Sequence, residues 1–285
     1  MTAFTLTSDH LADLAATGAE QVVVETEGRP RLSLLDYGGE GVTVIMLPGI
    51  TTPAMSFDFV SQGVRADYRV LALDIRGRGQ SEAGTSWTLD DYAEDVAAVV
   101  EQLGLDRPIL VGHSMGARIA AMAVARSPQA YRGAVIADPP LTGPGREPYP
   151  TPLSVFESQL SEAYAGTTAD DVARWWPRWP RREQELRARW LASCDLDAVR
   201  GSYHSFDDVD LLPIWSQVSL PAVFMFGEES PVVTAAGLVE CQQANEAATY
   251  IGVEAAGHMV FWDNYPSAMQ LLTSALREIV ATPST

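Results

Sequence analysis

The stretch Ile109-Leu-Val-Gly-His-Ser-Met-Gly-Ala-Arg118 combines an apolar run, a serine flanked by glycines and the start of an alanine-rich run. The apolar run is typical of a buried strand, and residues 115–126 predict a helix that follows it directly. Gly112 and Gly116 lack a Cβ, so the chain can turn sharply between strand and helix and expose the Ser114 hydroxyl. This Gly-x-Ser-x-Gly turn predicts that Ser114 is a nucleophile.

Short aliphatic or β-branched runs recur on both sides of this turn. After the third run, strands and helices alternate, and continuous apolar runs such as 42–47 indicate strands that are buried on both faces of a mostly parallel sheet. The predicted strands are 22–26, 31–37, 42–47, 69–73, 109–111, 134–137, 222–226 and 249–253. The sequence therefore predicts an α/β fold with a sheet of eight strands flanked by helices.

The alternation of strands and helices breaks between residues 141 and 213. Prolines cluster at the start of this interval, and a stretch rich in Trp and Arg follows. Because the interval is too long for a plain loop, it predicts an inserted helical cap. We expect the cap to span 141–213 and the core to consist of two parts, 1–140 and 214–285.

Composition narrows the classes of function. The 19 basic and 37 acidic residues give a formal charge of −18, which disfavours nucleic acid and acidic membrane surfaces as partners. All 19 basic residues are Arg, so a Schiff-base or catalytic-lysine mechanism is excluded. There is no signal-peptide pattern and no apolar run of about 18 residues, so we expect a cytoplasmic protein without a membrane partner. A homo-oligomer is compatible with this composition, which does not decide the oligomeric state.

Two further segments supply the groups that a serine nucleophile needs. His258, in Ala255-Ala-Gly-His-Met-Val260, lies just after the last predicted strand and is the expected base. The Met115 amide begins the predicted helix, and Ile50 follows the third predicted strand in Leu47-Pro-Gly-Ile-Thr51. We expect these two backbone N–H groups to form the oxyanion hole.

The other histidines have weaker contexts. His113 precedes the nucleophile and is expected to point away from it and serve packing. His10 is expected to be exposed, and His204 is a candidate for substrate contact. No cluster of His, Asp, Glu or the two cysteines has the spacing of metal ligands, so the sequence predicts neither a metal nor an organic cofactor.

Four motifs in this order resemble the α/β-hydrolase superfamily. They are Leu47-Pro-Gly-Ile-Thr51, Leu73-Asp-Ile-Arg-Gly-Arg-Gly-Gln-Ser81, Gly112-His-Ser-Met-Gly116 and Ala256-Gly-His258. A closer similarity lies in Asp138-Pro-Pro-Leu-Thr-Gly-Pro-Gly-Arg-Glu-Pro-Tyr149, which resembles the N-formylmaleamate deformylase family of nicotinate breakdown. The hydrolases that cleave 2-(acetamidomethylene)succinate are similar too. The resemblance implies hydrolysis of an amide on a small, ring-opened intermediate that carries a carboxylate.

The third member of the expected catalytic triad departs from the superfamily pattern. Most members place an acid after the seventh strand in Gly-x-x-Asp, and here Ser230 occupies that position in Phe226-Gly-Glu-Glu-Ser-Pro231. Asp138, which ends the sixth predicted strand, is the expected acid, and the deformylase family carries its acid at the corresponding place. Glu228 and Glu229 are the rivals. An aspartate nucleophile, as in dehalogenases and epoxide hydrolases of this fold, is excluded because residue 114 is Ser.

The cap predicts the charge of the substrate. Residues 172–200 hold seven Arg and four acids, so the segment carries a local charge of +3 and suits an anionic small molecule. A solvated amphipathic helix is the alternative interpretation. The candidate substrate-binding residues are Arg146, Tyr149, Arg174, Arg178, Trp176 and His204.

A carboxylesterase or a C–C bond hydrolase fits the same triad, and a ligand-binding protein without catalysis is the alternative from another class.

Overall fold

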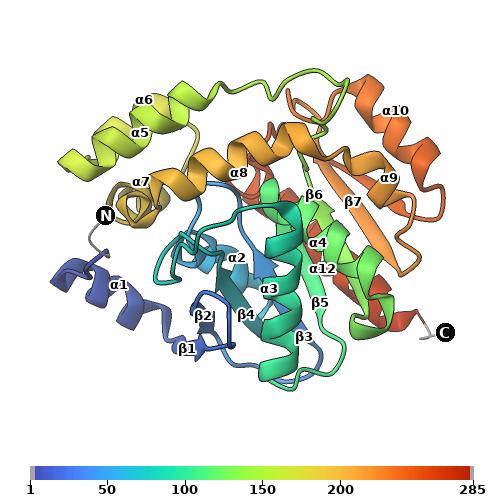
Figure 1. Cartoon of the computed structure of the whole chain (residues 1–285), viewed down its shortest axis with the longest axis horizontal. Coiled ribbons are helices and arrows are strands. Elements are labelled where there is room, and N and C mark those ends of the chain that lie inside the picture. The colour runs from blue at the N-terminus through green and yellow to red at the C-terminus, as the bar shows by residue number, and fades with distance from the viewer. Residues whose placement is uncertain (1–3, 283–285) are drawn as a thin grey trace.

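The computed structural model describes residues 4–282, and its strands form one sheet in the order β1-β2-β4-β3-β5-β6-β7-β8 (Figure 1). β2 pairs antiparallel with β1 and with β4, and all other neighbouring strands are parallel. The strands are β1 (Glu20–Val24), β2 (Leu32–Asp36), β3 (Thr43–Leu47), β4 (Arg69–Asp74), β5 (Ile109–His113), β6 (Gly133–Ala137), β7 (Ala222–Gly227) and β8 (Thr249–Val253). The predicted α/β class and its mostly parallel sheet of eight strands are confirmed.

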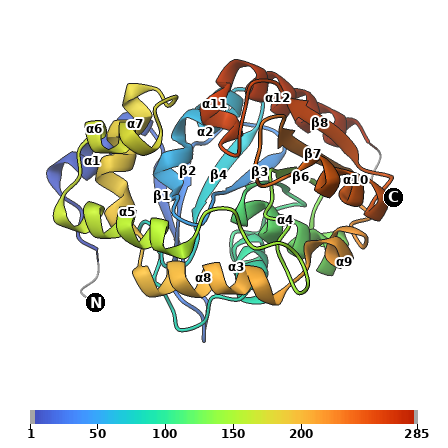
Figure 2. The same ribbon diagram turned by 90° about the horizontal axis from the view of Figure 1, so that it is seen from above.

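Helices cover both faces of the sheet, as the view from above shows (Figure 2). One face carries α3 (Leu89–Gln102) and α4 (Met115–Arg126), and the other carries α2 (Asp58–Val64) and α12 (Tyr265–Ala281). Successive side chains of β3 enter opposite layers, because strand side chains alternate between faces. Ile45 and Leu47 pack on the side of α3 and α4, and Met46 packs on the side of α2 and α12.

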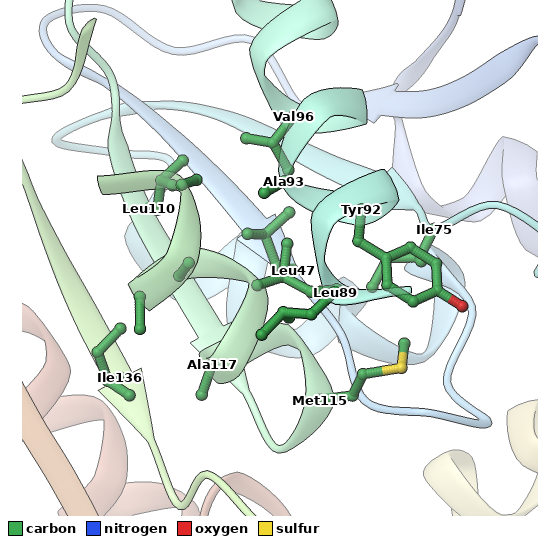
Figure 3. Close-up of a cluster of buried hydrophobic side chains, with 14 of the residues drawn as sticks. Leu47, Ile75, Leu89, Tyr92, Ala93, Val96, Leu110, Met115, Ala117 and Ile136 are labelled. Carbon is green, nitrogen blue, oxygen red and sulfur yellow. The ribbon is translucent and has the colours of Figure 1, made fainter. Parts of the chain in front are cut away.

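The layer under α3 and α4 is a dense apolar core (Figure 3). Leu47 and Leu110 from adjacent strands lie beneath Val96 of α3 and Ala117 of α4, and all four side chains are almost completely buried. Met115, the first residue of α4, belongs to the same cluster. The turn that carries Ser114 is therefore anchored in the core on both sides.

The segment between β6 and β7 is helical, in the interval where the sequence predicts a cap. It forms α5 (Leu153–Ala165), α6 (Ala169–Trp175), α7 (Arg181–Trp190), α8 (Leu196–Asp208) and α9 (Leu211–Trp215). Helices α5, α6 and α7 stand to one side of the sheet, and α8 runs back along it (Figures 1 and 2). The domain boundaries at 141 and 213 stay a prediction, and α9 extends across the second of them.

The N-terminal helix α1 (Ser8–Thr17) packs against α7 of the cap. Asp13 accepts hydrogen bonds from Arg189 Nε (2.7 Å) and from the Trp190 indole (2.8 Å). His10 Nε2 donates to the Arg189 carbonyl at 3.0 Å. The expectation that His10 is exposed is wrong, because this contact with the cap leaves its side chain only 7% exposed.

Five elements of the described chain remain. They are the helices α10 (Ala235–Ala244) and α11 (Val260–Asp263) and the short 3₁₀ turns at Ala54–Phe57, Pro128–Ala130 and Leu191–Ser193. Among the described helices, none is both long and apolar enough to cross a membrane.

Candidate active site

Ser114 sits on a strained turn between β5 and α4. Its φ of 57° and ψ of −120° lie outside the common regions for a residue with a side chain. The turn requires glycine on both sides of Ser114, because backbone atoms of neighbouring segments approach these two positions too closely for a side chain. A Cβ on Gly112 would lie 2.1 Å from the Gly116 carbonyl oxygen, and one on Gly116 would lie 1.8 Å from the Leu47 carbonyl oxygen. Only glycine fits at either position.

Three side chains from separate strand ends form a hydrogen-bonded chain. Ser114 follows β5, Asp138 follows β6, and His258 lies in the loop after β8. The distance from Ser114 Oγ to His258 Nε2 is 3.0 Å, and that from His258 Nδ1 to Asp138 Oδ2 is 2.7 Å. A serine, a histidine and a buried carboxylate in this order can perform nucleophilic acyl transfer.

The Asp138 carboxylate is fully buried and held by several donors. Its Oδ1 accepts from the Gly227 amide at 3.0 Å, and its Oδ2 accepts from Ser230 Oγ at 2.6 Å and from His258. The Ser230 oxygen itself accepts from the Val232 amide at 3.1 Å, which directs the serine hydrogen toward Asp138. The loop after β7 thus supplies donors to an acid from β6.

The two rival acids lie in the same loop but face solvent. Glu228 and Glu229 are both exposed, and Glu229 pairs with Arg178 at 3.2 Å. The structure therefore brings Asp138, rather than either glutamate, to the imidazole of His258.

A buried arginine, Arg78, holds the loop after β3 that carries the expected oxyanion donor. Ile50 lies in the lining of the same cavity as Ser114, and its carbonyl accepts from Arg78 Nε at 2.9 Å. Met115 directly follows the nucleophile at the first position of α4, where a backbone N–H lacks a helical partner. The sequence motif contains Arg78 without indicating its role, because the contact with Ile50 spans 28 residues of chain.

A cavity of about 310 Å³ opens above Ser114 and His258, which is at the small end of ligand pockets. The exposed surface of its wall is largely apolar, with Phe156 and three tryptophans, although many of its lining residues carry polar side chains. The lining residues are Gly49, Ile50, Thr51, Thr52, His113, Ser114, Tyr149, Thr151, Val155, Phe156, Gln159, Trp175, Trp176, Trp179, Arg187, Pro231, Val232, His258, Met259 and Asp263. The cavity suits a small molecule and offers it both apolar surface and polar side chains.

Two of the candidate substrate-binding residues lie in this lining. Trp176 stacks on Trp179 with ring centroids 5.0 Å apart. Tyr149 places its hydroxyl 3.2 Å from His258 Nε2. Burial, followed by the nearby Asp138 charge, raises the pKa of Tyr149 well above its ordinary value, so this hydroxyl is a neutral donor.

The other four candidates lie outside the lining. Arg146 pairs with Glu240 and Asp210, and Arg174 pairs with Asp171 at 2.8 Å. Arg178 pairs with Glu229, and His204 is an exposed residue of α8. We therefore do not assign these four side chains to the substrate.

The expectation for His113 is met only in part: its buried ring packs against Phe57 and Trp262 as expected. It lines the cavity next to Ser114 instead of pointing away, and its Nε2 donates to the His258 carbonyl at 2.8 Å. Desolvation, reinforced by the nearby His258, lowers the pKa of His113 to about 3, so the ring is neutral. This side chain positions the backbone of the loop that carries His258.

Arg187 is one of the lining residues that the sequence did not single out. It was one of seven arginines in the cap segment, and the sequence held no signal that distinguishes it from the others.

Within residues 4–282, no group of three or more His, Cys, Asp or Glu is arranged to hold a metal. The expected independence from cofactors stays a prediction.

Known proteins provide a separate line of comparison. A family model for the α/β-hydrolase fold matches residues 42–265. An N-formylmaleamate deformylase from Pseudomonas putida is 34% identical over 236 residues, which is 82% of this chain and 88% of that protein. A 2-(acetamidomethylene)succinate hydrolase from Mesorhizobium japonicum is 29% identical over 249 residues, with 82% and 87% covered.

The comparison with solved structures finds the same kind of enzyme as the comparison of sequences. The crystal structure of an N-formylmaleamic acid deformylase from Pseudomonas putida superposes with a TM-score of 0.84 at 31% identity, and the match covers 90% of this chain and all of that chain. The family match, the order of the strands and the Ser114 turn agree with one another. This chain belongs to the α/β-hydrolase family.

Proposed function

We propose that this hydrolase cleaves the C–N bond of a small N-formyl or N-acyl amide that carries a carboxylate, through an acyl-enzyme on Ser114. The substrate would be a ring-opened intermediate of N-heterocycle catabolism. The observation that carries the mechanism is the chain from Ser114 through His258 to the buried Asp138, with distances of 3.0 and 2.7 Å, at the base of a small cavity.

The first half of the cycle forms the acyl-enzyme. Ser114 Oγ attacks the acyl carbon as its proton passes to His258 Nε2, and the carbonyl oxygen gains the negative charge. The backbone N–H groups of Met115 and Ile50 stabilise that oxyanion. When the tetrahedral intermediate collapses, the C–N bond breaks and Nε2 gives its proton to the leaving nitrogen.

The second half releases the acid. His258 takes a proton from water, the resulting hydroxide attacks the ester carbon, and the C–Oγ bond breaks as Ser114 regains its proton. For N-formylmaleamate the products are formate and maleamate. Asp138 holds Nδ1 protonated and stabilises the imidazolium that forms in both halves. We propose that the Tyr149 hydroxyl, which lies 3.2 Å from Nε2, contacts the leaving nitrogen.

The names of the relatives support a substrate that contains both an amide and a carboxylate. The names of three of them specify N-formylmaleamate, 2-(acetamidomethylene)succinate and (E)-2-((N-methylformamido)methylene)succinate as substrates, and each compound joins an amide to at least one carboxylate. The small cavity fits molecules of this size. A carboxylesterase or a C–C bond hydrolase would use the same triad, and a binding protein without catalysis would use the same cavity.

The test is hydrolysis of N-formylmaleamate by the purified chain, followed as formate release. We expect turnover by the parent protein and a loss of ~10⁴-fold or more in Ser114→Ala, because triad members act as a unit. Formyl, acetyl and unsubstituted amides of C4 and C5 dicarboxylates define the acyl group.

Three results would contradict this proposal. Faster hydrolysis of simple esters than of every amide would indicate a carboxylesterase, and cleavage of C–C bonds alone would indicate the other hydrolase. A Ser114 that a fluorophosphonate does not label would indicate a binding protein without an activated serine.

A further inference from the structure

The arginines of the cap segment 172–200 divide into two groups. Six of them pair with a carboxylate on the surface or at the edge of the cap: Arg174 with Asp171, Arg178 with Glu229, Arg181 with Asp170, Arg182 with Asp58, Arg189 with Asp13, and Arg200 with Glu157. The seventh, Arg187, has no carboxylate partner within the described part of the chain. Among residues 4–282 it is also the only arginine in the cavity lining.

Arg187 is held in place by neutral acceptors. Its Nη1 donates to the Thr51 carbonyl at 2.6 Å, and its Nη2 donates to Thr51 Oγ1 at 3.1 Å and to Gln159 Oε1 at 3.0 Å. These bonds fix the guanidinium between α5, α7 and the loop after β3, and they leave part of its donor fork without an acceptor among residues 4–282. None of them neutralises the positive charge.

The environment makes this uncompensated charge unfavourable. Only 4% of the Arg187 residue surface is exposed, and burial lowers the pKa of its guanidinium to about 10, so the group is still charged at neutral pH. A buried charge without a counter-ion is destabilising, and an anion in the cavity would remove that penalty. Two other buried arginines, Arg78 and Arg118, also have no carboxylate partner in the described part of the chain, but neither lines the cavity.

Arg187 is connected through Thr51 to the loop that carries the proposed oxyanion donor. Thr51, which accepts two of its hydrogen bonds, directly follows Ile50, whose N–H is the proposed oxyanion donor. Of the residues that the structure describes, one carboxylate, Asp263, lies in the lining, and its Oδ2 atom accepts from the Gly257 amide beside His258. The cation and the acid thus belong to different parts of the wall.

We propose that Arg187, with Thr51 and Gln159 as its supports, is the subsite that binds a carboxylate of the substrate while the amide carbonyl lies at Ser114. The identity of the amide rests on the proposed function, whereas the anion site itself rests on the geometry of Arg187. The aromatic wall excludes water from the pair, which strengthens a charged hydrogen bond. The subsite selects free acids over neutral esters.

Gln159→Glu is a direct test because it keeps Arg187 in place. The substitution changes an amide oxygen 3.0 Å from Nη2 into a carboxylate of the same shape, which supplies an internal counter-ion and competes with the ligand. Calorimetry measures the affinity of the full chain for maleate, a dianion, and for dimethyl maleate, its neutral diester. We expect the parent to bind maleate and not the diester, and Gln159→Glu to raise the maleate Kd by ~10-fold or more.

Two arginine variants complete the design. Arg187→Gln removes the cation from the cavity and is expected to weaken maleate binding by at least ~10-fold. Arg178→Gln removes the same charge from the same cap segment at an exposed position that pairs with Glu229, and we expect its Kd to stay within about 2-fold of the parent value. If Arg187→Gln does not fold, Gln159→Glu still decides the matter.

The outcomes separate the two proposals. Equal affinity of the parent for maleate and its diester, an unchanged Kd in Gln159→Glu, or an equal loss in Arg178→Gln would overturn the subsite. Binding is measured without turnover, so a subsite that passes while no amide is hydrolysed would reject the proposed function alone. Conversely, hydrolysis of N-formylmaleamate with the same KM in Gln159→Glu would reject the subsite alone.

Discussion

At the scale of single residues, Asp138 and Glu229 offer a matched comparison. Asp138→Asn removes the acceptor that holds His258 Nδ1 protonated at 2.7 Å, so we expect kcat for amide hydrolysis to fall by about 10³–10⁴-fold. Glu229→Gln alters an exposed ion pair with Arg178, and its kcat is expected to stay within about 2-fold of the parent. Steady-state kinetics of both variants on one substrate checks this. The opposite ranking would move the acid to the loop after β7.

The individual residues also show how far the sequence could lead. The glycine-flanked serine and a histidine after the last strand are local patterns, and the structure places Ser114 and His258 within hydrogen-bonding distance. The contribution of Ser230 to Asp138 was not predictable, because it joins loops that are 92 residues apart. The same limit applies to Arg187, since its contacts with Thr51 and Gln159 depend on how the cap closes over the core.

At the scale of elements, the strands were predictable because their apolar runs are continuous, whereas α1 left no comparable signal. The predicted strand 249–253 coincides with β8, and β1 at the edge of the sheet was placed two residues too late. α1 begins at a capping box between Thr7 and His10, but its docking on α7 depends on residues far away in the chain.

The contact between α1 and α7 leads to a prediction about stability. Asp13→Asn weakens hydrogen bonds from Arg189 and Trp190 at the cap, and we expect the free energy of unfolding to fall by about 1–3 kcal/mol. Asp9→Asn makes the same charge change at an exposed site of the same helix, and we expect a loss of about 0.5 kcal/mol. Urea unfolding of both variants measures the two values. A loss in Asp9→Asn as large as in Asp13→Asn would show that helix charge, and not docking, is responsible.

At the scale of the whole molecule, His113 links the stability of the fold to pH. Burial lowers the pKa of His113 to about 3 in the folded state, whereas in the unfolded chain it is near its ordinary value of 6.5. Below pH 6.5 the unfolded chain therefore binds a proton that the folded chain does not. The stability that the neutral ring contributes is present above pH 6.5 and is lost as the pH falls toward 3.

His113→Gln keeps an amide N–H at about the reach of Nε2 for the His258 carbonyl and cannot titrate. We expect the decrease in unfolding free energy between pH 7 and pH 4 to be smaller in this variant than in the parent by about 3 kcal/mol. Urea unfolding at the two pH values gives the comparison. Asp74, whose pKa burial raises to about 6, acts in the opposite direction but is present in both proteins. The same decrease in both proteins would mean that His113 does not contribute to acid sensitivity.

The stacked tryptophans at the junction of cap and core have an optical consequence. Trp179 lies between Trp176 of the cap and Trp262 of α11, with centroids 5.0 Å apart in each pair and interplanar angles of 22° and 19°. Indole transitions at this separation couple, so the near-ultraviolet circular dichroism of the protein contains a signal from the stack itself. Trp176 and Trp179 both belong to the cap, so movement of the cap away from α11 separates only Trp179 from Trp262 and removes the part of the signal that comes from this pair. The near-ultraviolet spectrum therefore reports the contact between the cap and α11 without a dye or a substrate.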